Sequence, residues 1–221
     1  MPRVPSNALR FKRRLLRWFR AAGRDLPWRR TRDPYRIVVS EFMLQQTQVT
    51  RVAEFYPRFL GRFPTIQALA GARPAQVREA WEGLGYYARA RNLHALSRAV
   101  VHDGGRVPDD PDHLADLPGV GRYTAGAIAS FAYEKRVPAV DTNVARVLGR
   151  VFRTRRHTGD LWSLAQRILP TRRTTTWEFN QALMDLGATI CTARRPRCLE
   201  CPVRSACRTG SGKRYAPSGK R

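Results

Sequence analysis

Three acidic residues interrupt apolar stretches of the chain, where a carboxyl group could do acid–base chemistry. The three are Glu41 in the apolar stretch 37–44, Asp141 in the stretch 137–141 and Asp185 in the stretch 183–186. Most of the other acids among the 17 have polar neighbours in the sequence. A carboxyl group in apolar surroundings has a raised pKa unless it is paired, which keeps an acid protonated for catalysis. The alternative is a buried acid that pairs with arginine, which fits Asp185 best, or caps a helix, which fits Asp141. A capping carboxylate can still direct its second oxygen at a substrate, so Glu41 and Asp141 are the candidate catalytic residues.

The four cysteines are the second chemical signal. They lie within 17 residues, spaced C-x6-C-x2-C-x5-C, and no other cysteine occurs in the chain. Four thiolates this close suit a tetrahedral zinc ion or a four-iron cluster, and two local disulfides are a minor alternative in a reducing compartment. One tight C-x2-C turn with longer arms favours an iron–sulfur cubane over a zinc knuckle. We expect a structural role, with the ligands Cys191, Cys198, Cys201 and Cys207.

A glycine turn, Leu117-Pro118-Gly119-Val120-Gly121, separates two helical patterns. Two glycines two residues apart allow a tight turn and a close approach of the backbone to a ligand. Their amide groups, with the N-terminus of the helix that starts at Arg122, would face an anion. An ordinary turn between helices is an equally good interpretation. A P-loop or a dinucleotide loop is excluded because the stretch is too short and lacks the preceding strand.

The charge balance points to a polyanionic partner. Lys and Arg number 41 against 17 acids, a formal net charge of +24 with a pI of about 11.5. Nucleic acid is the first candidate for such a chain. A coding bias toward arginine would explain why lysine is rare, but not why acids are few. No apolar run approaches the about 20 residues of a membrane span, so we expect no membrane partner.

The apolar spacing is helical throughout, with breakers between the helices, so we predict an all-α protein. The basic amphipathic stretch near the N-terminus reads as a folded helix rather than a transit peptide, and no secretory signal is visible. We expect a cytoplasmic, nucleoid-associated protein. The predicted helices are 7–22, 34–47, 50–60, 74–81, 86–101, 111–116, 122–132, 142–152, 160–169 and 176–189.

Together these features resemble the endonuclease III-like helix-hairpin-helix DNA glycosylases and, among them, the MutY family of adenine glycosylases. The resemblance covers roughly residues 7–210, and the order of its motifs is very specific. It rests on the four cysteines and on LPWR at 26–29, VSEFMLQQTQV at 39–49, GLGYYAR at 83–89, LPGVGRYTA at 117–125 and VDTNV at 140–144.

The resemblance implies two helical lobes and a DNA duplex from which the target nucleotide is flipped out. A six-helix lobe with the helix-hairpin-helix would span 27–132, and residues 1–26 with 133–221 would form a discontinuous lobe with a [4Fe–4S] cluster loop. A monomer acting on double-stranded DNA with a mismatch or an oxidised guanine is the expected assembly. Gln46 would wedge into the duplex and Thr47 would contact the opposite base. The other implied DNA contacts are Trp28, Arg29, Leu84, Tyr86, Gly119, Gly121 and Arg122, with Leu84 alternatively a core residue.

The same resemblance assigns the chemistry of N-glycosidic bond cleavage. An acid is needed on the base and an anion on the sugar, as in glycoside hydrolysis. Glu41 would protonate adenine N7, Asp141 would stabilise the cationic sugar, Tyr123 would orient the sugar site and Asn143 would fix Asp141. Lyase members carry lysine at the position of Tyr123, and a Schiff base needs an amine, so a monofunctional hydrolase is predicted.

Two features leave the substrate open. MutY proteins continue into a domain that reads 8-oxoguanine, whereas 14 residues follow Cys207 here, so we expect the catalytic lobes alone to recognise the opposite base. A related branch with tyrosine at the same place removes thymine or uracil opposite guanine. The string Gln45-Gln46-Thr47-Gln48 favours adenine opposite 8-oxoguanine or guanine. A non-catalytic, metal-bearing DNA-binding protein is a distant third interpretation.

Overall fold

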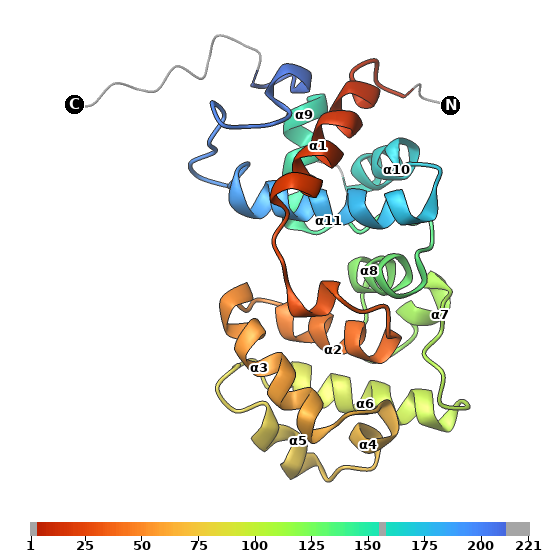
Figure 1. The fold of residues 1–221 in the computed structure, drawn as a ribbon. Coiled ribbons are helices and arrows are strands. Elements are labelled where there is room, and N and C mark those ends of the chain that lie inside the picture. Colours follow the sequence, from red (N-terminus) through yellow and green to blue (C-terminus); the bar gives the residue numbers. More distant parts are fainter. Residues whose placement is uncertain (1–3, 155–157, 211–221) are drawn as a thin grey trace, which may run out of the picture. The chain divides into compact units, whose positions relative to one another are not determined.

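The computed structural model describes residues 4–154 and 158–210. The chain forms two compact units: Met1–Arg24 with Glu134–Arg221, and Asp25–Tyr133 (Figure 1). All regular elements in the described ranges are helices, so the all-α prediction is confirmed. In those ranges, no helix combines the length and the apolarity that a bilayer span needs.

The first unit joins the N-terminal helix to the C-terminal two fifths of the chain. Helix α1 packs on α11, α11 packs on α9, and a short 3-10 helix, η2, touches α1 (Figure 1). Phe11 of α1 meets Phe152 and Phe179 edge-to-face, with ring centroids 5.4 and 6.1 Å apart. The elements are α1 (Ala8–Ala22), α9 (Thr142–Phe152), α10 (Thr158–Ile168), α11 (Arg173–Thr189) and η2 (Arg204–Ala206).

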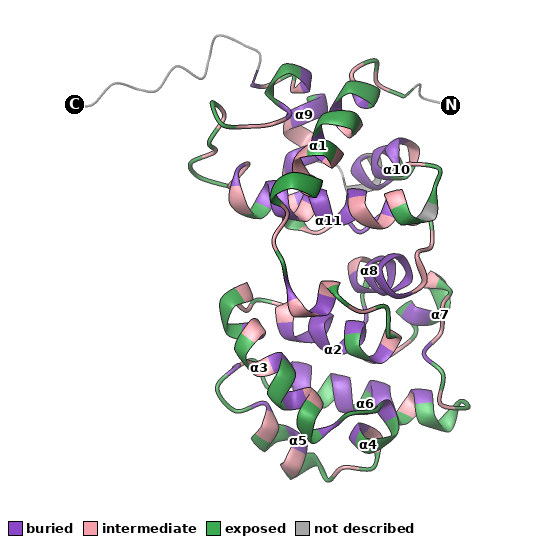
Figure 2. Cartoon of the chain, viewed as in Figure 1, coloured by how far each residue is buried: buried purple, intermediate pink, exposed green. Residues whose placement is uncertain are grey.

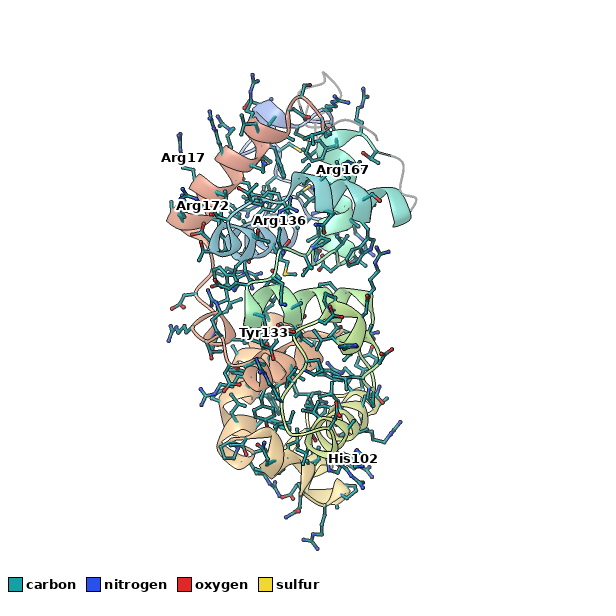
Figure 3. The ribbon with its side chains drawn as sticks, turned by 90° about the vertical axis from the view of Figure 1, so that its right-hand side faces the viewer. Arg17, His102, Tyr133, Arg136, Arg167 and Arg172 are labelled. Atoms are coloured by element: carbon teal, nitrogen blue, oxygen red, sulfur yellow. The ribbon has the colours of Figure 1, made fainter. Side chains whose placement is uncertain are left out.

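Helix α1 confirms the prediction of a folded amphipathic helix. Phe11 and Leu15 are fully buried in the core of the first unit, while Arg17 is exposed and projects outward (Figure 3). The Arg14 Nε donates to the carbonyl oxygen of Pro202 at 2.6 Å. The helix therefore holds the cysteine-rich segment as well as completing the core.

The second unit is built around α2. This helix packs against α3, α6 and α8, and most of its residues are buried (Figure 2). Its N-terminus is set by Pro34 and by Asp33, whose Oδ1 accepts from the Arg36 N–H at 3.0 Å. The elements are η1 (Pro27–Arg29), α2 (Pro34–Leu44), α3 (Val49–Arg62), α4 (Ile66–Ala70), α5 (Pro74–Ala80), α6 (Ala88–His102), α7 (Pro111–Ala115) and α8 (Arg122–Tyr133).

Several elements differ from the sequence prediction, among them α11, which begins at Arg173 rather than at residue 176. Helix α2 ends at Leu44 rather than at residue 47, so the Gln45–Gln48 string lies outside it. The short α4 was not predicted. It is started by Thr65, whose hydroxyl oxygen accepts from the Ala68 N–H at 3.1 Å, and one turn offers too few residues for a periodic pattern.

Candidate functional site

Glu41 lies on the buried part of helix α2. It is 4% exposed and is flanked along α2 by Phe42 and Met43, which are fully buried. A carboxyl group is rarely buried to this extent in a protein unless it has a partner or a function. The structure thus agrees with the apolar surroundings read from the sequence.

The glycine turn joins α7 to α8, and only one of its two glycines is required by the backbone. Gly119 has φ +76°, and a Cβ there would stand 2.7 Å from Asn92 Cβ and 3.0 Å from Phe42 Cε1. At Gly121 a Cβ would meet nothing within 4 Å. The turn therefore brings the backbone against α6 and α2, which fixes the start of α8 beside the helix that carries Glu41.

The start of α8 presents a helix N-terminus with no acidic residue in its first turn. Arg122 is exposed there and Tyr123 is half-buried. Because the N-terminus of a helix carries partial positive charge and N–H donors, the place suits an anion.

Two neighbouring segments of this unit carry the residues predicted to probe DNA. Gln46, after α2, is exposed with φ +57°, and Thr47 beside it is half-buried. Tyr86, before α6, is 62% exposed with φ +48°. Leu84 is 5% exposed, which agrees with its alternative interpretation as a core residue.

Trp28 is also a core residue. Its ring is 5% exposed and meets Tyr56 edge-to-face at 5.7 Å between centroids, so the expected DNA contact is not available to the ring. The DNA contact of Trp28 was expected only from the resemblance carried by LPWR, and a resemblance in sequence does not say which way the ring faces. Arg29, the next residue, is half-buried.

In the first unit, Asp141 is the N-cap of α9, as its position in the sequence predicted. Its Oδ1 accepts from the Val144 N–H at 2.7 Å, and its Oδ2 accepts from Asn143 Nδ2 at 2.9 Å. Asp141 itself is half-buried. Both oxygens are therefore oriented by donors on the first turn of the helix.

Asn143 is held in turn by Arg146, a residue that the sequence analysis did not single out. Arg146 Nη2 donates to Asn143 Oδ1 at 2.7 Å and to the Gly187 carbonyl at 2.8 Å, and its Nε donates to the Cys191 carbonyl at 2.8 Å. A Cβ at Gly187 would stand 2.8 Å from Asn143 Cβ. The signal that could have found Arg146 is its place three residues after Asn143, on the same face of α9.

The four cysteines line one cavity at the C-terminal end of the first unit. All are free thiols, and the apolar side chains of Val151, Leu186, Ile190 and Val203 complete the wall. In the described ranges, no three His, Cys, Asp or Glu side chains converge closely enough to hold one metal ion. Thiols that surround a cavity, rather than a point, fit a cubane better than a single zinc ion.

The sulfur atoms also receive hydrogen bonds. Arg150 Nη1 lies 3.4 Å from Cys191 Sγ, and the Gly210 N–H donates to Cys207 Sγ at 3.3 Å. Burial raises the pKa of Cys201 to about 11, so this thiol is neutral at pH 7 without a metal. Donors aimed at sulfur and an apolar wall are the environment in which iron–sulfur clusters are held.

Asp185, the third acidic residue in an apolar stretch, pairs with an arginine, as its sequence surroundings predicted. Its carboxylate is 2.6 Å from Arg24 Nη2, and its Oδ2 accepts from the Arg24 backbone N–H at 2.9 Å. The pair fastens the end of the N-terminal segment to α11.

Comparison with known proteins places these features in a family. Residues 39–168 match the HhH-GPD superfamily of base excision DNA repair proteins, and residues 191–207 match the iron–sulfur binding domain of endonuclease III. The match confirms the [4Fe–4S] cluster prediction, and the matched range begins at Cys191 and ends at Cys207.

Curated relatives include two enzyme types. The chain is 47% identical to the adenine DNA glycosylase of Rattus norvegicus over 90% of its own length and 41% of the relative. It is 48% identical to that of Mycobacterium tuberculosis over 86% of its length and 64% of the relative. It is 41% identical to the thymine-DNA glycosylase of Aeropyrum pernix over 89% of its length and 92% of the relative.

Solved structures agree on the fold. A thermostable thymine-DNA glycosylase superposes with a TM-score of 0.86 at 32% identity, covering 93% of this chain and 97% of the other. An endonuclease III trapped as a covalent intermediate with DNA superposes at 0.80 with 25% identity, covering 95% and 98%. The chain spans less than half the length of the rat relative and about two thirds of the mycobacterial one. By its motifs, its helices and its cysteine loop, the chain belongs to the HhH-GPD superfamily of base excision DNA repair proteins.

Proposed function

We propose that the chain is a monofunctional DNA glycosylase that hydrolyses the N-glycosidic bond of adenine opposite 8-oxoguanine or guanine. The observation that carries this assignment is the identity of 47–48% to adenine DNA glycosylases across 86–90% of the chain. The held carboxylate of Asp141 and the buried Glu41 are the acid pair that the reaction requires. The enzyme acts as a monomer on a duplex from which the adenine is flipped out.

Asp141 supports the sugar half of the reaction. When the base leaves, the sugar becomes an oxocarbenium ion, and an oriented anion stabilises that charge without having to reorganise. Both Asp141 oxygens are fixed by N–H donors from Val144 and Asn143. Such a carboxylate can stabilise the cation, bond to it briefly and then guide water.

Glu41 supports the base half. Adenine leaves more easily once a ring nitrogen has been protonated, and the resemblance to the MutY family assigns that protonation to N7. The burial of Glu41 within α2 excludes bulk water from this acid. Thymine has no N7, so the role of Glu41 is also what separates the two candidate substrates.

The glycine turn, the residues that probe the base stack and the cysteine-rich segment bind the DNA. The N-terminus of α8, with the Gly119 turn before it, binds a backbone phosphate through N–H groups. The exposed side chains of Gln46 and Tyr86 enter the base stack, and Thr47 meets the opposite base. The cluster stiffens the basic 191–207 segment against the duplex.

The test is a set of duplexes bearing A:8-oxoguanine, A:G, T:G and U:G, treated with protein and then with alkali. We expect cleavage at A:8-oxoguanine and A:G, and loss of that cleavage in Glu41→Gln, with Glu79→Gln, an exposed acid of the same unit, as the matched control. Cleavage of T:G and U:G alone would replace adenine by the second candidate. That candidate rests on the 41% identity to a thymine-DNA glycosylase.

The monofunctional character has its own test. Tyr123 cannot form a Schiff base, so borohydride should trap no covalent protein–DNA adduct in good yield. Efficient trapping would show that a lysine or another amine attacks the sugar, and would overturn the hydrolase assignment.

A further inference from the structure

A buried arginine, Arg89, occupies a place that two local rules disfavour. It is the second residue of α6 and is 6% exposed. The first turn of a helix favours acidic side chains, because the helix dipole is positive there. A buried charge is also unfavourable unless hydrogen bonds replace its lost hydration. A residue that is unfavourable both for the helix dipole and for the burial of its charge is a candidate for a functional role.

One nitrogen of the guanidinium is bonded to the segment that follows α2. Arg89 Nη1 donates to the carbonyl oxygens of Phe42 at 3.1 Å and Met43 at 2.7 Å, and also to that of Gln45. These carbonyls belong to the C-terminal end of α2, where the helix dipole is negative and a cation is favoured. This contact explains why α2 stops at residue 44.

The other nitrogens are bonded to the loop that precedes α6. Arg89 Nη2 donates to the carbonyls of Leu84 at 3.1 Å and Gly85 at 3.0 Å, and Nε lies 3.5 Å from the carbonyl of Tyr86. The guanidinium also lies over the Tyr86 ring, 5.5 Å from its centroid. One planar fork therefore joins two segments that are about 40 residues apart in the sequence.

Both joined segments hold a residue in the left-handed region. Gln46 has φ +57° and Tyr86 has φ +48°, and within the described ranges only Glu134 and Arg153 are other non-glycine residues with positive φ. The peptide plane before Gln46 carries the Gln45 carbonyl, and the plane before Tyr86 carries the Gly85 carbonyl. Arg89 donates a hydrogen bond to each of these carbonyls. It therefore fixes the orientation of the peptide groups that precede Gln46 and Tyr86, the two residues with unfavourable positive φ.

We infer that Arg89 is a positioning residue that locks segments 45–47 and 83–87 into one rigid unit for probing the base stack. The inference rests on the proposed function for what the unit probes. The exposed Gln46 and Tyr86 side chains then meet the duplex in a fixed relation to each other, because the same guanidinium sets both backbones. Arg89 itself touches no DNA.

The test variant is Arg89→Lys, which keeps the charge but replaces the planar fork by one compact ammonium group. The separate Nη1 and Nη2 donors that bond to the two segments are then lost. Arg98→Lys, an exposed site on α6, is the matched control. We expect single-turnover excision to fall at least 10-fold in Arg89→Lys. The fluorescence rise of 2-aminopurine beside the target base should be lost, while affinity for undamaged duplex stays within 2-fold. The control should match the wild type in all three measurements.

Two outcomes would overturn the inference. Wild-type excision and fluorescence in Arg89→Lys would show that the double grip is not needed. An equal loss of affinity for undamaged DNA would show that Arg89 supports only the general fold.

If the Arg89→Lys variant does not fold, amide hydrogen exchange of the wild-type protein tests the same inference. The amides of Thr47 and Leu84 donate to Leu44 and Trp81 carbonyls, one in each segment. If the segments form one unit, the exchange of these amides should show equal protection within about 3-fold, and a 100-fold difference would refute the lock. If the wild type excises no base, the proposed function fails. The 2-aminopurine fluorescence and the hydrogen exchange of the two amides still test the role of Arg89 in that case.

Discussion

At the scale of single residues, Asp141 combines two duties that a substitution can separate. Its Oδ1 caps α9 and its Oδ2 is held by Asn143. Asparagine caps helices about as well as aspartate does, but it carries no charge with which to stabilise a cationic sugar. The structural and the chemical role of this side chain therefore depend on different properties of one group.

Asp141→Asn should consequently keep the helix cap while excision is lost. We expect a loss of about 1–2 kcal/mol in the free energy of unfolding, because the new NH2 group cannot accept from Asn143 Nδ2. The single-turnover rate should fall roughly 10²–10⁴-fold. Thermal unfolding and a gel assay on A:8-oxoguanine duplex measure the two effects. Glu178→Gln, which removes a surface ion pair with Arg20 in the same unit, is the control. A variant that unfolds readily but still excises at the normal rate would assign Asp141 to the fold alone.

At the scale of elements, the turn between α7 and α8 is closely packed. Gly119→Ala adds a Cβ at 2.7 Å from Asn92 in a left-handed backbone, so we expect a loss of about 1–3 kcal/mol in stability and weaker DNA binding. Gly121→Ala adds its Cβ to open space and should keep the stability of the wild type. Chemical denaturation of both variants checks the pair, and equal stabilities would contradict the steric account.

Helix α9 links Asp141 to the cysteine-rich segment through Arg146. Arg146→Gln removes the bonds to Gly187 and Cys191, so Asn143 loses its support. We expect excision to slow about 10-fold or more with little change in affinity for undamaged DNA. Titration and single-turnover kinetics separate the two quantities, and a drop in affinity alone would place Arg146 at the DNA surface instead.

The elements also show how far a sequence can be read. The helices were predictable because apolar spacing survives in every long segment, and Asp141 was predictable because a cap must stand just before its helix. Leu84 and Trp28 were not, because a residue's type does not tell whether its side chain faces the core or the solvent. Arg89 was missed for another reason: its bonds to the carbonyls of Phe42 and Met43 join segments more than 40 residues apart, which leaves no mark on local sequence.

At the scale of the whole molecule, the net charge of +24 should dominate binding to DNA. If about six phosphates are neutralised, the association constant falls roughly 10³-fold or more between 50 and 200 mM salt. Fluorescence anisotropy with undamaged duplex at four salt concentrations gives the slope directly. An association constant that does not change with salt would mean that the arginines are paired within the protein or do not contact the DNA phosphates.

The cluster gives the whole molecule a visible signature. Four thiolates around an iron–sulfur cubane absorb broadly near about 400 nm, so purified protein should be yellow-brown. Chelation after oxidation should bleach this band and loosen the segment 191–207, measured as faster proteolysis there. Colourless protein that contains zinc instead would contradict the ligand assignment.

The discontinuity of the first unit has a consequence for how the protein is made. Phe11 packs on Phe152 and Phe179, which leave the ribosome long after it. At roughly 5–20 residues per second, the newly made α1 waits on the order of 10–30 s with its aromatic face uncovered. The aromatic core of the first unit therefore closes only after α9 and α11 have been made.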